Sequence, residues 1–192
     1  MTKQTKGLQR NRSTRGYSVV ELLVTMAVIS VLTAIAVPSL LTTYRNYQMD
    51  DAAGQVAGIV KFTRYEAIRR NNTLNCVVAV INNQVAIFSD DNGNGNLDPN
   101  EREILLSGSA TLVDSGAVSG AGALVGPVGS GALTTVNPAS GIIAFDGRGA
   151  KTTAGASVYW VGNANYGFRA VVVLPSGSIE VWSYATSTWQ QL

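Results

Sequence analysis

The chain has 192 residues, enough for one domain plus an appendage, and only 14% of them are charged. It contains no histidine and a single cysteine, Cys76. An intrachain disulfide and a cysteine-based zinc site are therefore excluded, and the commonest general base of enzymes is absent, so we do not expect an enzyme. The net charge of +2 is unevenly distributed, because residues 1–16 carry five basic and no acidic residues and the rest has a net charge of −3. This distribution does not favour nucleic-acid binding by bulk charge.

A long apolar segment follows the basic leader. From Val19 to Leu41 it contains one charged residue, Glu21. About 20 apolar residues in a helix span a bilayer core, so residues 17–41 are predicted to be a transmembrane helix with a cytoplasmic N-terminus. The segment is longer than the apolar region of a cleaved signal peptide. A plain signal-anchor explains its length and flanking charge but not Glu21, because a carboxylate inside an apolar span is costly and usually functional.

The residues around Glu21 resemble a known processing site. The string RGYSVVELL at 15–23 is similar to the class III leader junction of type IV pilins and type II secretion pseudopilins. The resemblance implies that a prepilin peptidase cleaves between Gly16 and Tyr17, removes the leader 1–16 and methylates the new amino group of Tyr17. It also implies that Glu21 directs assembly by pairing with the amino terminus of a neighbouring subunit, and that Pro38 is the helix-kinking proline of the family. Tyr17 departs from the more usual Phe.

The helix is predicted to continue beyond the membrane as an amphipathic segment, residues 42–72. The sequence lacks proline and turn clusters up to Asn71 and Asn72, so we expect one helix over about residues 18–70. Its apolar positions recur at intervals of three and four. They are Ala52, Ala53, Val56, Ile59, Val60, Thr63, Ala67 and Ile68. The run FTRYEAIRRN at 62–71 resembles the end of the first helix in the GspH/FimT subfamily, which narrows the resemblance to minor pseudopilins and minor pilins.

Residues 73–192 are predicted to form a small antiparallel β domain packed on the helix, which gives an α+β, pilin-like fold. Asn82 and Asn83 predict a tight hairpin, and Pro175-Ser176-Gly177 predicts another turn. The Gly/Ala/Ser-rich segment 115–141 is expected to be a long loop or weakly structured insertion. The expected strands are 74–81, 84–88, 104–106, 111–113, 142–145, 157–161, 168–174 and 178–184. Tyr166 and the tryptophans Trp160, Trp182 and Trp189 are interpreted as core or edge packing.

Two further stretches support the subfamily. IIAFDGRG at 142–149 resembles its strand and turn, and RAVVVLPSGSIEV at 169–181 resembles its C-terminal hairpin. DNA-uptake members carry Gly-Arg-x-Arg in that hairpin, whereas the matching residues here are Gly177-Ser178-Ile179-Glu180. Both arginines are missing, and phosphate contact depends on cationic side chains, so DNA is not an expected partner.

An acidic loop at residues 90–101, DDNGNGNLDPNE, matches the twelve-residue calcium pattern D-x-[DN]-x-[DN]-G-x5-E. Calcium binds a ring of hard oxygens, so a possible Ca²⁺ site is predicted, with weak affinity because few ligands are carboxylates. A solvated Asn/Gly/Asp hairpin loop explains the same composition. The expected ligands are Asp90, Asn92, Asn94, Asn96, Asp98 and Glu101.

The resemblance implies a minor pseudopilin of the type II secretion system, a single-pass protein of the bacterial inner membrane with a periplasmic β domain. Its expected partners are the other pseudopilins or pilins of one filament, the prepilin peptidase and the inner membrane, and no cofactor is required. Three alternatives remain. The first is a FimT-like minor pilin of a type IV pilus, which is involved in pilus assembly or DNA uptake. The others are a membrane-anchored calcium-binding module and an enzyme. The enzyme is disfavoured because no nucleophile–base constellation is present.

Overall fold

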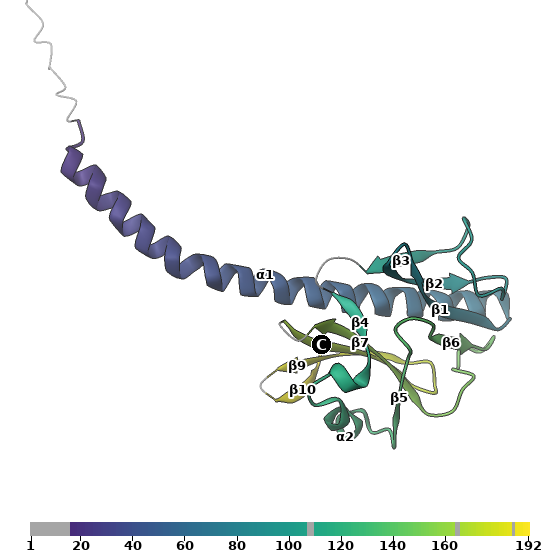
Figure 1. Ribbon diagram of the computed structural model, residues 1–192. Helices are drawn as coiled ribbons and strands as arrows, with labels where there is room; N and C mark the ends of the chain where they lie inside the picture. The colour runs from purple at the N-terminus through teal and green to yellow at the C-terminus, as the bar shows by residue number, and fades with distance from the viewer. Residues whose placement is uncertain (1–15, 107–109, 164–165, 186) are drawn as a thin grey trace, which may run out of the picture. The chain divides into compact units, whose positions relative to one another are not determined.

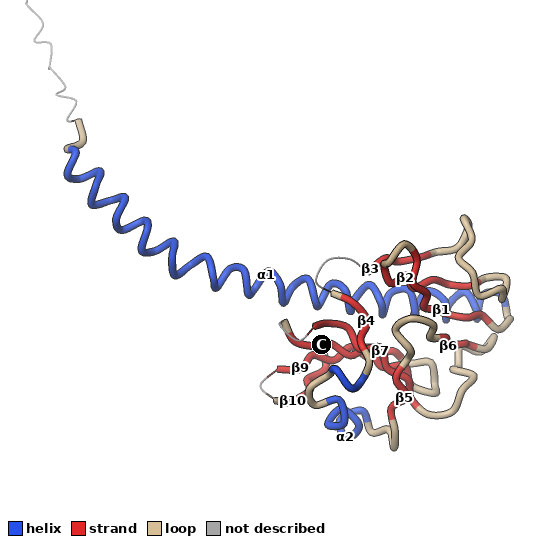
Figure 2. Tube along the Cα trace, in the orientation of Figure 1, coloured by secondary structure: helices blue, strands red, loops and turns tan. Residues whose placement is uncertain are grey.

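The computed structural model describes residues 16–106, 110–163, 166–185 and 187–192 (Figure 1). The chain divides into two compact units, Met1–Leu41 and Thr42–Leu192. Helix α1, Val19–Arg70, contributes residues to both units, and its bounds confirm the prediction of one long helix. All described strands, β1 to β10, belong to the second unit (Figure 2).

Both ends of α1 are capped. A serine side chain caps the start, and an asparagine in a left-handed backbone conformation caps the end. At the start, the Ser18 hydroxyl accepts the amide N–H of Val20 at 3.3 Å, as an N-cap serine does. At the end, Asn71 adopts a left-handed conformation with φ of 47°. The Asn71 amide donates to the carbonyl of Ile68, and the Asn72 amide donates to that of Ala67, both at 3.1 Å. These two bonds form a Schellman motif, which explains why the helix stops where the asparagine pair predicted.

The part of α1 in the second unit buries one face. The predicted stripe from Ala52 to Ala67 is buried, and Met49 and Ala57 extend it. Ile68 is an exception, because 40% of it remains exposed. Burying this face of small and branched side chains removes apolar surface from water and holds the helix against the strands.

The first sheet has four antiparallel strands in the order β3-β2-β1-β6. The strands are β1 (Leu74–Ile81), β2 (Gln84–Asp90), β3 (Glu103–Leu106) and β6 (Ile142–Phe145). Asn82 and Asn83 join β1 to β2 with φ values of 49° and 64°. A two-residue hairpin turn in which both central residues have positive φ matches the twist of the flanking strands, so the predicted hairpin is confirmed.

The second sheet has six strands, with β10-β9-β8-β7-β4 in order and β5 paired with β7. The strands are β4 (Thr111–Val113), β5 (Leu133–Thr135), β7 (Ala156–Asn163), β8 (Gly167–Val173), β9 (Ile179–Ala185) and β10 (Thr188–Gln191). The pairing of β5 with β7 is parallel and the others are antiparallel, so the predicted antiparallel domain has one exception.

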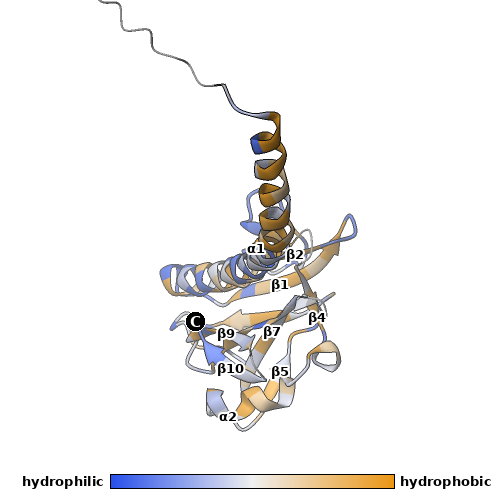
Figure 3. Ribbon diagram, turned by 90° about the vertical axis from the view of Figure 1, so that its left-hand side faces the viewer, coloured by the Kyte–Doolittle hydropathy of each residue, from blue (hydrophilic) through white to orange (hydrophobic). Residues whose placement is uncertain are grey.

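The second unit has two layers of buried apolar side chains. The first layer lies between α1 and both sheets and includes Val56, Phe145 and Tyr159. The second covers the opposite face of the six-stranded sheet. Figures 1 and 3 show α2 (Val125–Val128) on that side of the sheet, away from α1. The expected core role of the tryptophans is confirmed, because all of them are at least 93% buried in this second layer.

The Gly/Ala-rich segment departs from the prediction of a long loop. Residues 115–141 contain two short 3-10 helices, Ser115–Ala117 and Ala121–Leu124, followed by α2 and β5. Leu124 is fully buried, and the carbonyl of Gly120 accepts the indole N–H of Trp189 at 2.8 Å. The segment is ordered because tertiary contacts with the second layer determine its conformation. The terminal strand β10 was also not predicted.

Candidate functional site

The predicted cleavage site lies immediately before α1. Gly16 and Tyr17 precede the helix and take no regular secondary structure. Tyr17 is 85% exposed, and no atom of the described residues, its chain neighbours aside, lies within 4 Å of a Cβ built on Gly16. An accessible, non-helical peptide bond next to a residue without a side chain is suitable for a protease that binds an extended substrate in a narrow active site. Cleavage here and methylation of Tyr17 stay predictions.

Glu21 lies in the first turn of α1 and is exposed. Within the part of the chain that the structure describes, its carboxylate makes no hydrogen bond or ion pair. A carboxylate at a helix N-terminus is favoured by the helix dipole, although this accounts for less than about 1 kcal/mol at an exposed site. The charge of Glu21 therefore has no partner among the described residues, which do not include residues 1–15. Ser18, three residues earlier, was missed by the sequence analysis, although Ser-x-x-Glu is a helix-start signature.

The residues of α1 around Glu21 are almost all hydrophobic and are coloured orange in Figure 3. Every large apolar side chain from Val19 to Leu41 is at least 46% exposed. The hydroxyls of Thr25, Ser30 and Thr33 donate to main-chain carbonyls of the same helix at 2.8–2.9 Å, so they need no external partner. By length and composition this is a helix that can cross a membrane, with a mean hydropathy of 2.4 over its most apolar window. Pro38 lies inside it.

The predicted calcium loop connects β2 to β3 and is closed by its own carboxylates. Asp90, 1% exposed, accepts the amides of Gly93 at 2.7 Å and Gly95 at 3.0 Å. Glu101 accepts the amide of Asp91 with one oxygen and that of Asp98 with the other, at 2.8 and 3.0 Å. Gly93 and Gly95 have φ of 77° and 71°, which explains the two glycines.

The polar side chains of this loop converge on Asp98. Its Oδ2 atom accepts the amide nitrogens of Asn92 at 2.6 Å and Asn94 at 2.8 Å. The Oδ1 atoms of Asn92 and Asn94 accept the main-chain amides of Asn94 and Asn96. Among the described residues no group of three or more His, Cys, Asp or Glu side chains is placed to hold a metal ion. These bonds satisfy the loop internally, and calcium binding stays a prediction.

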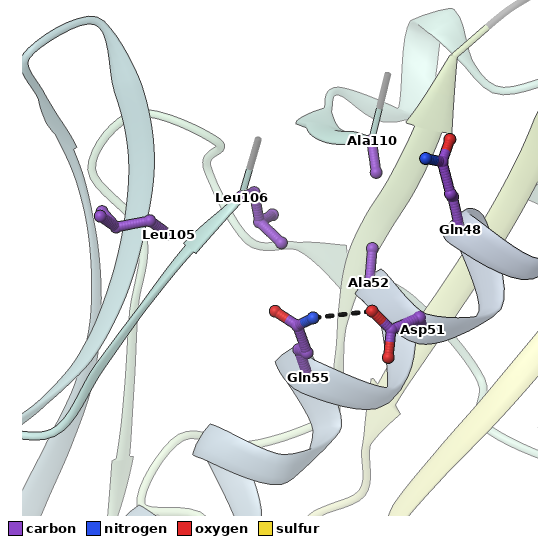
Figure 4. Close-up of a pocket in the computed structure, with 7 residues that line it drawn as sticks. All are labelled: Gln48, Asp51, Ala52, Gln55, Leu105, Leu106 and Ala110. Carbon is purple, nitrogen blue, oxygen red and sulfur yellow. Dashed lines mark hydrogen bonds between the residues drawn. The ribbon is translucent and has the colours of Figure 1, made fainter. Parts of the chain in front are cut away.

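A groove of about 190 Å³ lies on α1 beside the end of β3 and the start of β4 (Figure 4). Its lining is Gln48, Asp51, Ala52, Gln55, Leu105, Leu106 and Ala110. The Gln55 amide donates to the Asp51 carboxylate at 2.8 Å, and no nucleophile or second titratable group faces that carboxylate from the lining residues. The described residues of the groove therefore form no nucleophile–base pair.

The hairpin between β8 and β9 contains the residues compared with the DNA-uptake motif. Gly177 has φ of 80° and forms the turn, and Glu180 accepts the indole N–H of Trp182 at 3.1 Å. Beside the turn, Arg64 of α1 donates from Nε to the carbonyl of Gly149 at 2.8 Å. The four residues Gly177–Glu180 present no cation to a phosphate, and the absence of DNA binding stays a prediction.

Comparison with known proteins gives two family matches. A family described as type II transport protein GspH matches residues 52–177, and a prokaryotic N-terminal methylation motif matches residues 11–37. No curated protein matches the sequence. Among solved structures, the type IV minor pilin FimU of Pseudomonas aeruginosa is similar with 11% sequence identity and a TM-score of 0.47, over 75% of this chain and 93% of that chain.

Proposed function

Because the chain belongs to the GspH family of type II transport proteins, we propose that it is a minor pseudopilin, a non-enzymatic subunit of the type II secretion pseudopilus. The observation that carries the proposal is the match of a methylation motif to residues 11–37, which supports a leader junction before an exposed apolar helix with one acidic residue. In this proposal the helix inserts in the inner membrane and joins a filament of similar subunits that supports protein export across the outer membrane.

Glu21 supplies the specificity of assembly in this proposal. Cleavage after Gly16 frees the amino group of Tyr17, which is then methylated and stays positively charged. Placing an unpaired carboxylate in the bilayer costs roughly 3 kcal/mol. Pairing Glu21 with the amino group of an adjacent subunit removes much of this cost for both charges. A subunit therefore enters the filament where such an amino group is available.

The basic leader determines the orientation in this proposal. Its five basic residues favour the cytoplasmic side of the inner membrane, so the N-terminus is cytoplasmic and the β domain is periplasmic. There the second unit contacts partner subunits or exported proteins.

A second candidate, supported by the same methylation motif, is a FimT-like minor pilin that assists assembly of a type IV pilus. The two candidates share the leader junction and the helix and differ in the filament they join. Deletion of the gene distinguishes them, because loss of exported proteins with normal pili supports the pseudopilin, whereas loss of pili with normal export supports the pilin. We do not propose DNA uptake, since the hairpin Gly177–Glu180 lacks both arginines.

The assembly proposal is tested by Glu21→Leu, with Ser30→Ala as a control on the same helix. We expect Glu21→Leu to reach the membrane fraction normally but to lose co-purification with the other filament subunits, while Ser30→Ala retains it. Mass spectrometry of the wild type is expected to show a mature chain that begins at methylated Tyr17. Co-purification of Glu21→Leu at the wild-type level would overturn the role of this carboxylate, and an intact leader would overturn the proposal itself.

A further inference from the structure

Lys151 is a buried cation in the second unit. It is 7% exposed and lies on the connection between β6 and β7. Its backbone is fixed, because it bridges to Phe145 and its amide donates to the carbonyl of Pro175 at 3.0 Å. Burial lowers the pKa of the Lys151 ammonium, since desolvation disfavours the charged form. A buried charge of this kind calls for a compensating group.

The partners of Lys151 within the chain are neutral. Its Nζ donates to the hydroxyl of Thr153 at 2.7 Å and to that of Ser157 at 3.0 Å. An ammonium has three donors, so one remains for another acceptor. No carboxylate among the described residues forms an ion pair with it. Arg169 is the other buried cation among the described residues, and it is paired with Asp50. Of these two cations, only Lys151 therefore lacks a counter-charge.

Lys151 lines a cavity of about 240 Å³ between β5, the start of β6 and the start of β7. The other lining residues are Thr134, Thr135, Val136, Asn137, Gly141, Ile142, Thr153, Ala154 and Ser157. Lys151 is the single charged residue of the set. Thr153 and Ile142 are exposed, so the cavity opens to solvent.

Neutral donors line the same cavity as the ammonium. The Oδ1 atom of Asn137 accepts the amides of Ala139 and Ser140, which leaves its amide nitrogen without an acceptor among the described residues. The hydroxyls of Thr153 and Ser157 accept from Nζ, and each keeps its own proton for a further acceptor. The cavity thus combines one positive charge with spare N–H and O–H groups.

We propose that this cavity binds a carboxylate. The two oxygens of a carboxylate accept several hydrogen bonds, and its single negative charge matches the single ammonium. A phosphate dianion calls for more positive charge than the lining residues provide. The volume admits a small carboxylic acid, an acidic side chain or the C-terminus of another polypeptide. The site is built from residues 134–157 and is independent of the N-terminal helix and of the function proposed above.

The proposal is tested by NMR titration of the full chain in non-ionic detergent micelles. The probes are acetate, glutarate, inorganic phosphate, and a short peptide with either a free or an amidated C-terminus. We expect saturable shifts of the Lys151 and Thr153 resonances with carboxylates and weaker ones with phosphate. Shifts with the small acids alone identify a small-molecule site. Shifts with the free but not the amidated peptide identify a polypeptide carboxylate as the ligand.

Lys151→Met keeps the length of the side chain and removes its charge. We expect it to fold and to weaken carboxylate binding at least about tenfold, as the loss of a charge-assisted hydrogen bond implies. Lys61→Met, at an exposed lysine of α1, is the matched control and should bind as the wild type does. Thr153→Val provides a second, milder variant if Lys151→Met does not fold. Absence of shifts in the wild type, phosphate binding as strong as carboxylate binding, or unchanged binding by folded Lys151→Met would each overturn the proposal.

Discussion

The turn between β8 and β9 comes so close to its neighbours that Gly177 has no room for a methyl group. A Cβ atom at this position would lie 1.9 Å from the carbonyl oxygen of Gly149 and 2.6 Å from Nε of Arg64. These two atoms form the 2.8 Å hydrogen bond that joins α1 to the turn after β6. We therefore predict that Gly177→Ala forces two segments apart and breaks this bond.

Three effects contribute to the cost of Gly177→Ala. A non-glycine residue at φ of 80° costs roughly 1–2 kcal/mol. Overpacking costs roughly 1–3 kcal/mol, and the loss of a hydrogen bond from a charged donor costs roughly 1.5–3 kcal/mol. Because relaxation of the turn relieves the overlap and breaks the bond together, the terms do not add fully, and we expect a loss of about 3–5 kcal/mol.

Gly155→Ala is the matched control. Gly155 has φ of 74°, and a Cβ atom there has no neighbour within 4 Å, so only the conformational cost of roughly 1–2 kcal/mol applies. Urea denaturation of the full chain in detergent, followed by tryptophan fluorescence, measures both variants. If the two variants lose the same free energy of unfolding within error, the close approach at Gly177 contributes nothing and the reasoning is wrong.

Three other predictions concern the core, alkaline pH and calcium. Ile59→Ala should lower the free energy of unfolding by roughly 2–5 kcal/mol, because Ile59 is 2% exposed. Ile142 is 58% exposed, so Ile142→Ala should change that free energy by no more than about 0.5 kcal/mol. Equal losses in the two variants would contradict the assigned burial. Burial raises the pKa of the Cys76 thiol to about 11 from 9.0, so the folded state keeps a proton that the unfolded state loses. The free energy of unfolding should therefore be unaffected by Cys76 below pH 9 and fall by up to about 3 kcal/mol toward pH 11. The measurement is Tm as a function of pH. Cys76→Ser should make Tm fall less steeply, and the raised pKa of Tyr159 accounts for the part that remains. If the loop 90–101 binds calcium with the weak affinity of extracellular modules, about 10 mM Ca²⁺ should stabilise the chain by about 1–3 kcal/mol in a thermal-shift assay, and Mg²⁺ should not. The absence of both a thermal shift and calorimetric heat on addition of Ca²⁺ would exclude the site.

Features with a local cause were predictable from the sequence. The helix from Val19 to Arg70 follows from unbroken apolar and then amphipathic periodicity, and its end follows from the asparagine pair. The hairpin at Asn82 and Asn83 was predictable because asparagine tolerates positive φ. The exposed position of Glu21 near the helix start follows from its place in the apolar segment.

Features with a tertiary cause were missed. Strand β10 is short and mostly polar, and it exists because it pairs with β9 and buries Trp189. The parallel pairing of β5 with β7 joins segments about twenty residues apart and has no local pattern. The cavity at Lys151 was invisible for the same reason, because its lining comes from separate stretches between residues 134 and 157. A lone lysine in a sequence does not indicate whether it is buried or paired.

The two apolar layers of the second unit differ in their intrinsic fluorophores, because one contains tryptophan and the other does not. Trp160, Trp182 and Trp189 are the three tryptophans of the whole chain, and all belong to the layer on the side of α2. The ring centroids of Trp160 and Trp189 lie 5.6 Å apart, close enough for exciton coupling in circular dichroism. Indole emission therefore reports solvent entry beneath the Gly/Ala-rich segment directly, whereas it reports the helix side only through unfolding of the whole unit. A change in indole emission that precedes the loss of helical circular dichroism therefore marks detachment of that segment, with no label attached.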